Sequence, residues 1–77
     1  MNGQGQGSRK TLGRRVRNLR DVRGWSQEHF AHRAGLDHAD LDGLESGQQD
    51  PTLVTLETVA GALGMTTSEL LAGIERF

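Results

Sequence analysis

The sequence contains no cysteine and no tyrosine, a single proline and no long apolar run. The absence of cysteine excludes disulfides and thiolate metal sites. No stretch approaches the roughly 20 apolar residues that a membrane-spanning helix needs, and no signal-peptide pattern is present. We therefore expect a cytoplasmic protein without a membrane partner. The 77 residues suffice for one small domain, and their hydrophobic fraction of 34% predicts a thin core.

The charged residues are divided unequally along the chain. Residues 1–33 hold eight of the nine basic residues and two of the ten acidic ones, whereas residues 34–77 hold one basic and eight acidic residues. A basic segment is the electrostatic signature of a nucleic-acid-binding surface. The alternative is that the two segments neutralise each other within the fold, and the sequence leaves both interpretations open.

Apolar residues recur at helical spacing through most of the chain, and no segment alternates as a strand does. These patterns predict an all-α fold of five helices. We expect residues 1–8, rich in glycine and glutamine, to be a flexible tail, followed by one domain over residues 9–77. The predicted helices are residues 11–22, 27–34 and 38–45, a fourth capped by Thr52 and ended by Gly64, and a fifth starting at Thr67.

The segment from Ser26 to Leu36 predicts a short helix, a tight turn and the start of a second helix. Ser26 is a favourable N-cap, because its hydroxyl can accept from the free N–H groups of the first turn. Gly35 is typical of the left-handed residue that ends a helix, and Asp37 can cap the helix that follows. Two helices joined so tightly are typical of a helix-turn-helix, which places one helix in the DNA major groove.

Short motifs at fixed spacing extend from residue 11 to residue 73. They are Leu12-Gly13-Arg14-Arg15-Val16-Arg17-Asn18-Leu19-Arg20, Gly24-Trp25-Ser26-Gln27-Glu28, Phe30-Ala31, Ala34-Gly35-Leu36, Leu44-Glu45-Ser46-Gly47, Pro51-Thr52-Leu53, Leu56 and Ala62-Leu63-Gly64. Together they resemble the phage-repressor/Cro-type (XRE-like) helix-turn-helix family. The resemblance implies a compact five-helix domain, usually dimeric, that binds double-stranded operator DNA and represses or activates nearby genes.

The resemblance also implies roles for individual residues. Gln27 would grip a DNA phosphate and brace the recognition helix, with Ser26 beside it at the same helix N-terminus. Arg20 and Glu45 would form an ion pair that fixes the tilt of this helix and directs the guanidinium towards a phosphate. The alternatives are a solvated Gln27 and a loose surface ion pair. Trp25 matches a position that packs in the core.

The residues expected to contact bases depart from the family pattern. The segment 37–43 carries three carboxylates and no lysine, arginine, asparagine or glutamine, so phosphates repel it. His38 could still donate to guanine, Ala39 contact a thymine methyl and Asp42 accept from cytosine N4. Gly43 could let the DNA approach the helix backbone closely. The predicted DNA-binding residues are Arg20, Ser26, Gln27, Asp37, His38, Ala39, Asp42, Gly43 and Gln48, together with arginines of the first helix.

The C-terminal residues Leu70, Leu71, Ile74 and Phe77 form an apolar set larger than a terminal helix needs. In the family this region often forms a two-fold interface, so we predict that these four residues join two chains in a homodimer. The alternative is that Leu70 and Ile74 pack inward.

No arrangement of catalytic residues and no phosphate-cradling glycine loop is present, so we do not expect an enzyme. His29 and His32 could bind a metal only if a third ligand converged on them, and we expect neither a metal nor a cofactor. The leading hypothesis is a sequence-specific transcriptional regulator that uses its third helix in the major groove. The alternative is a protein-interaction module, or an antitoxin, that keeps the fold with weakened DNA reading.

Overall fold

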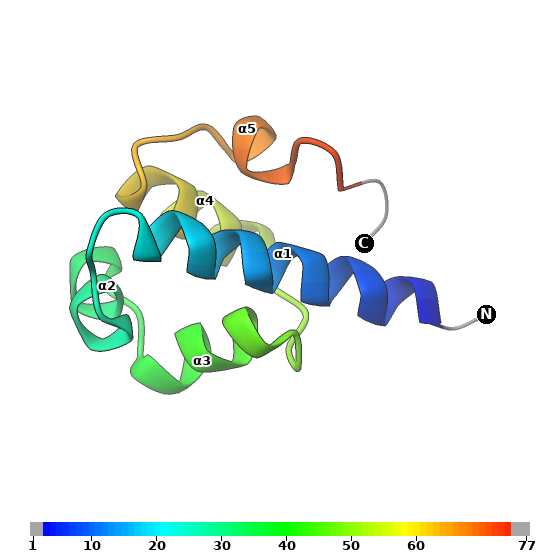
Figure 1. The fold of residues 1–77 in the computed structure, drawn as a ribbon, viewed down its shortest axis with the longest axis horizontal. Coiled ribbons are helices and arrows are strands. Elements are labelled where there is room, and N and C mark those ends of the chain that lie inside the picture. The colour runs from blue at the N-terminus through cyan, green and yellow to red at the C-terminus, as the bar shows by residue number, and fades with distance from the viewer. Residues whose placement is uncertain (1–2, 75–77) are drawn as a thin grey trace.

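The computed structural model describes residues 3–74, and this part of the chain is helical and contains no strand. The predicted all-α fold of five helices is confirmed. Figure 1 shows α1 running through the middle of the molecule, with α3 on one side, α4 and α5 on the other, and α2 across one end. The helices are α1 (Gly3–Asp21), α2 (Gln27–Ala34), α3 (His38–Ser46), α4 (Leu53–Ala62) and α5 (Thr67–Leu71).

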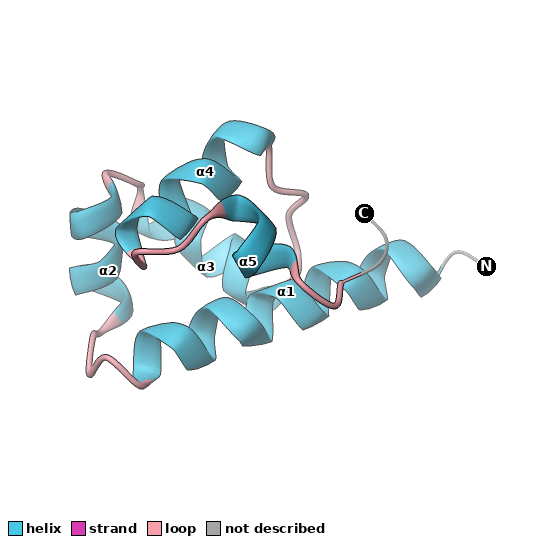
Figure 2. Ribbon diagram, turned by 90° about the horizontal axis from the view of Figure 1, so that it is seen from above, coloured by secondary structure: helices cyan, strands magenta, loops and turns pink. Residues whose placement is uncertain are grey.

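One apolar core forms where the five helices meet. Each helix contributes at least one fully buried side chain to it, and removal of this apolar surface from water is the main force that assembles the fold. Seen from above in Figure 2, α4 and α5 lie across the side of α1 that faces away from α3. The largest fully buried side chains are Phe30, Leu12, Leu41, Leu70, Val16 and Val59.

α1 begins at Gly3 and not near residue 11, so the predicted start of this helix is wrong. Residues 3–8 belong to the helix, although the sequence predicted a flexible tail there. The hydroxyl of Thr11 donates to the carbonyl of Gly7 at 2.8 Å, within the helix. Apolar residues recur at helical spacing only in the part of a helix that packs against the core, so this pattern marks the start of burial. Backbone hydrogen bonds can continue the helix beyond that part. The mobility of these residues in solution stays a prediction.

The ends of α2 follow the local sequence as predicted. The Ser26 hydroxyl accepts from the His29 N–H at 3.0 Å and starts the helix. Gly35 ends it with a φ of +71°, a conformation that side chains other than glycine rarely adopt. Asp37 occupies the N-cap position of α3, but its side chain makes no capping hydrogen bond. The turn between α2 and α3 therefore begins at Gly35, where the Leu36 N–H donates to the Ala31 carbonyl at 2.9 Å.

α5 begins at Thr67, as predicted, and the residue before it is the cap. Thr66, and not Thr67, is the N-cap, and its hydroxyl accepts from the Glu69 N–H at 3.0 Å. The Glu69 carboxylate in turn accepts from the Thr66 N–H at 2.9 Å. This reciprocal pair is a capping box, which the sequence analysis missed because it placed the cap one residue too late.

α1 and α3 approach each other closely at Gly13, which is buried. A Cβ atom added to Gly13 would lie 2.6 Å from the carbonyl oxygen of Leu44 and would also overlap that of Glu45. Both are backbone atoms of α3, so they cannot move without shifting the helix. The missing side chain at Gly13 therefore sets the spacing between α1 and the helix that is expected to contact DNA.

Candidate nucleic-acid interface

The inner and outer faces of α3 differ in character. Leu41 and Leu44 are buried and hold α3 against the core. The opposite side of the helix is open to solvent, which is the arrangement that a helix needs before it can enter a groove of DNA. The exposed residues, which we call the outer face of α3, are His38, Ala39, Asp40, Asp42 and Ser46.

The predicted ion pair between α1 and α3 is present. The Nε of Arg20 donates to Oε2 of Glu45 at 2.7 Å, and its Nη2 donates to Oε1 at 3.0 Å. The two side chains are only 10% and 4% exposed. The hydrogen bond to Glu45 raises the pKa of Arg20 above its ordinary value, so the guanidinium stays charged at all working pH values. This is a buried two-bond pair and not a loose surface contact.

The guanidinium of Arg20 has further partners within the protein. Its Nη1 donates to the Trp25 carbonyl at 2.8 Å and lies 3.3 Å from the Asp21 carboxylate. All three guanidinium nitrogens therefore have partners inside the protein, and the residue is 8% exposed. Arg20 positions α3 relative to α1, and its contact with a DNA phosphate stays a prediction.

The side chain of Gln27 links the start of α2 to α3. Its Nε2 donates to Glu45 Oε1 at 3.0 Å and to Asp42 Oδ1 at 3.4 Å. Its Oε1 lies 2.7 Å from Nε2 of His38. The predicted brace of the recognition helix is thus present in these contacts, but they occupy the amide that was expected to grip a phosphate. The N–H groups of the first turn of α2, which lack intrahelical acceptors, are the donors left there for an anion.

Gly43 does not offer an open approach to the helix backbone. It is buried, because the side chain of Gln49 lies over it: a Cβ added to Gly43 would be 2.5 Å from Cδ of Gln49 and 2.8 Å from its Nε2. The expectation that DNA would approach the backbone at this residue is therefore wrong. Gln48, the other predicted loop residue, is exposed. Gln49 was not among the predicted site residues. The only indication in the sequence was that α3 contains no glutamine and that the loop after it does.

Most arginines of the basic segment have partners within the fold. Arg9 pairs with Asp50 at 2.8 Å, in the loop that follows α3. Arg15 donates to carbonyls at the C-terminal end of α5, and Arg23 donates to the Leu63 carbonyl at the end of α4 at 2.9 Å. Cations are favoured at these helix ends by the helix dipole. Part of the positive charge is therefore used to hold the helices together.

Two other arginines of α1 remain open to a ligand. Arg14 and Arg17 are exposed and have no hydrogen-bond or ion-pair partner within residues 3–74. Arg17 lies at an open hollow of about 290 Å³, where α1 meets the start of α2 and the end of α3. The residues that line the hollow are Arg17, Arg20, Gln27, Asp42, Glu45 and Ser46.

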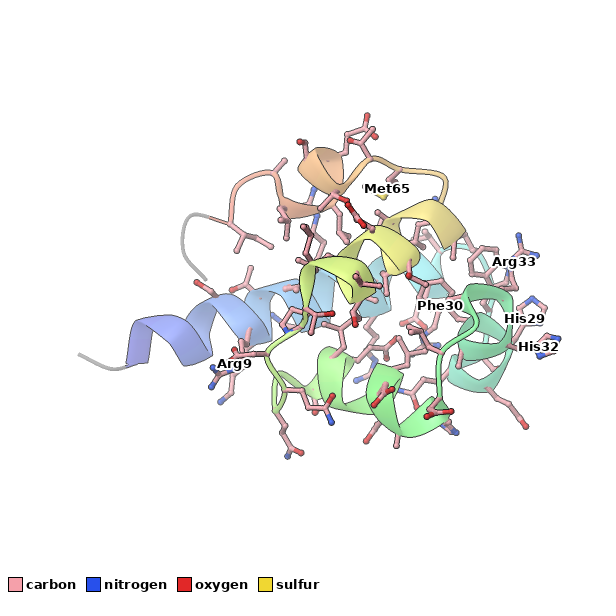
Figure 3. All side chains as sticks on the ribbon, turned by 180° about the vertical axis from the view of Figure 1, so that it is seen from behind. Arg9, His29, Phe30, His32, Arg33 and Met65 are labelled. Carbon is pink, nitrogen blue, oxygen red and sulfur yellow. The ribbon has the colours of Figure 1, made fainter. Side chains whose placement is uncertain are left out.

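The outward side of α2 carries a separate group of basic side chains. Figure 3 shows His29, His32 and Arg33 projecting from the end of the molecule that lies away from Arg9. The guanidinium of Arg33 stacks on the half-buried Trp25 ring, 4.4 Å from its centroid. Within the described residues, no group of three histidine or acidic side chains is placed to hold a metal ion.

The C-terminal apolar set is divided by the structure. Leu70 is fully buried in the core, so its predicted place in a dimer interface is wrong. Leu71 and Ile74 are partly exposed and pack against the edge of the core. Phe77 lies outside the described residues. Of the four residues predicted for the interface, Leu71 and Ile74 are therefore the two in the described part of the chain that a second chain could contact.

Residues 11–72 match the family model described as a helix-turn-helix domain. The chain belongs to this family. The predicted family resemblance is thereby confirmed over most of the chain, including the whole of α2 and α3. None of the helices in residues 3–74 combines the length and the apolar character needed to cross a membrane.

The helix-turn-helix chain is similar to named regulators. It is 38% identical over 61 residues to the immunity repressor protein of Bacillus phage phi105, a match that covers 79% of this chain and 42% of the repressor. A solved structure, the restriction-modification controller protein C.AhdI from Aeromonas hydrophila, superimposes with a TM-score of 0.75 at 39% identity, covering 79% of this chain and 92% of that one. These relatives and the family agree with the predicted class, a DNA-binding transcriptional regulator.

A third match is a structure of a protein–protein complex. The SinR protein/SinI protein complex superimposes with a TM-score of 0.76 at 28% identity, covering 80% of this chain and 61% of that one. The same fold therefore occurs in a protein that is held in a complex with another protein.

Proposed function

We propose that this helix-turn-helix protein regulates transcription by inserting α3 into the major groove of a specific DNA site. The observation that supports this most strongly is the rigid support of α3. Arg20 holds it to α1 through Glu45, and Gln27 holds it to α2, while its outer face stays exposed. A protein discriminates between bases when its side chains are held at fixed positions against the base edges. The contacts of Arg20 and Gln27 would fix the position of α3 in this way.

The sequence-independent part of the affinity would come from α1 and the start of α2. Arg14 and Arg17 are exposed and have no hydrogen-bond or ion-pair partner within residues 3–74, and the first-turn N–H groups of α2 beside Gln27 are suited to bind an anion. Such contacts to phosphates release counterions, so the affinity they provide falls steeply with salt. Ser26 serves this surface indirectly, because its hydroxyl caps α2.

The carboxylates of α3 are compatible with this role. Asp37 and Asp40 lie at the N-terminal end of the helix, where the helix dipole favours negative charge. Asp42 lines the hollow beside Arg17, and its Oδ1 accepts a hydrogen bond from Gln27 at 3.4 Å. Its second oxygen remains available to accept from cytosine N4.

The test is a titration of labelled duplex DNA from the region upstream of the protein's own gene. We expect the affinity to fall steeply between 50 and 200 mM salt, and to exceed the affinity for random DNA by at least about 10³-fold. Equal and weak binding to all sequences would contradict the proposal. It would instead favour the second candidate, a module whose acidic α3 binds a basic protein partner, in line with the protein complex formed by SinR.

Two variants separate the proposed contacts. Arg17→Ala should weaken binding to all sequences alike, because it removes one phosphate contact. The slope of log affinity against log salt concentration should become shallower by about one. His38→Ala should change base preference, because His38 lies on the outer face of α3. The matched control is Arg33→Ala, which removes an exposed arginine stacked on Trp25, away from α3, and should leave DNA binding unchanged. An unchanged base preference in His38→Ala would exclude His38 as a base-contacting residue.

We also propose that two chains act together as a homodimer in the cytoplasm, where the DNA is. Operator half-sites spaced by about 34 Å require two recognition helices held at that distance. Leu71 and Ile74 are the part of the predicted interface that the structure leaves accessible.

A further inference from the structure

The side chain of Gln49 takes the place of a missing side chain on α3. Gly43 follows Ala39 by four residues, so both lie on the same side of the helix, one turn apart. A Cβ added to Gly43 would lie 2.7 Å from Cγ of Gln49, 2.5 Å from its Cδ and 2.8 Å from its Nε2. The carboxamide of Gln49 therefore lies where a side chain of residue 43 would begin, beside the outer face of α3.

Gln49 is held over the helix by the backbone of Gly43 itself. The Gly43 carbonyl accepts from the N–H groups of Gln48 at 3.0 Å and of Gln49 at 3.3 Å. The same carbonyl accepts from the Ser46 hydroxyl at 3.2 Å. Gly47, with a φ of +77°, turns the chain back so that these contacts form. The loop after α3 is thus tied to the residue that Gln49 covers, which limits how far its side chain can move.

The carboxamide of Gln49 is available to a ligand. Gln49 is exposed, and its side chain makes no hydrogen bond to any residue in the described part of the chain. Its carboxamide has both a donor and an acceptor in one planar group, and the segment 37–43 contains no such group, because it has no asparagine or glutamine. A carboxamide matches the N6 donor and N7 acceptor of adenine in the major groove with two hydrogen bonds.

We infer that Gln49 is a specificity-determining residue, which supplies from the loop the adenine-contacting amide that α3 does not carry. The inference rests on the proposed insertion of α3 into the major groove. It adds to that proposal a base preference: the site should contain an A·T pair opposite the C-terminal half of α3. Gly43 is then required as glycine because any side chain would displace the Gln49 carboxamide.

The experiment begins with the full chain and a pool of randomised duplex DNA. Selection with the wild-type protein gives the preferred site, and affinities are then measured for every single-base-pair change of that site. Gln49→Ala should reduce the discrimination against changes at one or two adjacent A·T pairs by about 5- to 100-fold and leave the other positions unchanged. Gln49→Glu should shift the preference at the same position from adenine to cytosine, because a carboxylate can only accept, and cytosine N4 donates.

The matched comparison is Gln48→Ala, at the neighbouring exposed glutamine of the same loop, which is itself predicted to bind DNA. Loss of a phosphate contact there should lower the affinity for all sequences alike and leave the base preference unchanged at every position. Thermal unfolding of each variant checks that the fold is retained, which we expect because both side chains are exposed. Two results would overturn the inference about Gln49 and leave the proposed function standing. In both, the wild-type protein selects a DNA site, and Gln49→Ala either keeps the same base preference or loses affinity equally for all sequences. A wild-type protein that selects no site would instead contradict the proposed function.

Discussion

At the residue scale, Gly13 shows how the lack of a side chain can determine tertiary structure. The residue lies in α1, where glycine is less favourable than alanine by about 1 kcal/mol. Its presence there is explained by α3, whose backbone carbonyls at Leu44 and Glu45 occupy the space that a methyl group would need. The cost of glycine to the helix is therefore offset by a closer contact between two helices.

Gly13→Ala should lower the free energy of unfolding by about 1–3 kcal/mol, because the methyl group must push α1 and α3 apart. The measurement is thermal unfolding followed by circular dichroism. The control is Gly61→Ala, the same change at a helical glycine with no atom within 4 Å of the added Cβ. This control should be stabilising by up to about 1 kcal/mol. Equal effects of the two substitutions would mean that the close approach at Gly13 is not rigid.

A second residue-scale prediction compares two ion pairs of different burial. Arg20→Ala should cost about 3–5 kcal/mol of stability, because it leaves the Glu45 carboxylate, 4% exposed, without its partner. Arg9→Ala should cost at most about 1 kcal/mol, because its partner Asp50 is 76% exposed and is solvated by water. Chemical denaturation measures both. Similar losses in the two variants would show that burial does not set the strength of these pairs.

At the scale of single elements, α3 is held by contacts more than by its own sequence. It has nine residues, includes Gly43 in its interior and lacks a capping hydrogen bond from Asp37. Helices this short are marginal in water when isolated. Leu41 and Leu44 in the core, together with the bonds of Glu45 to Arg20 and Gln27, supply the stability. The same contacts that stabilise α3 therefore also fix its orientation.

The first turns of α1 are predicted to add little stability. Deletion of residues 1–7 should change the free energy of unfolding by less than about 0.5 kcal/mol, because α1 enters the core only from Leu12 onward. The control is deletion of residues 1–12, which removes Leu12 and should prevent stable folding. Thermal unfolding compares the two. A large loss in the shorter deletion would contradict the predicted tail and extend the domain to include it.

At the scale of the whole molecule, the uneven distribution of charge serves two purposes. Arg9, Arg15 and Arg23 bind carboxylates or carbonyls of later elements. Arg14 and Arg17 remain exposed on α1 without a partner in the described residues. Neutralisation within the fold and an open basic surface, which the sequence left as alternatives, are therefore both present, each on different residues.

The proposed homodimer gives a prediction at this scale. Sedimentation equilibrium should show a mass of two chains, and Leu71→Glu should shift the protein to one chain, because a carboxylate at this partly exposed position would have to be buried in the interface. The control is Val22→Glu on α1, where the residue is 77% exposed. It should leave the mass unchanged. A dimer that persists in Leu71→Glu would place the interface elsewhere.

The sequence predicted the helix-turn-helix and most helix boundaries because these depend on neighbouring residues. α2 has the predicted bounds, and Ser26 and Gly35 act at its ends as expected. The start of α1 was missed because a helix can continue past its buried part. The sequence left the place of Leu70 open between an interface and the core, because an apolar residue near a terminus packs inward or outward according to which elements surround it, and the structure buries it.

The sequence by itself determined the helical class and the helix-turn-helix motifs, because periodicity, capping and motif spacing are local properties. The pairing of Arg20 with Glu45, which are far apart in the chain, was predicted only through the family resemblance. Only the tertiary structure decided which arginines remain open and what covers Gly43. Those depend on contacts between residues far apart in the chain, such as Arg15 with the end of α5, and no local pattern specifies them.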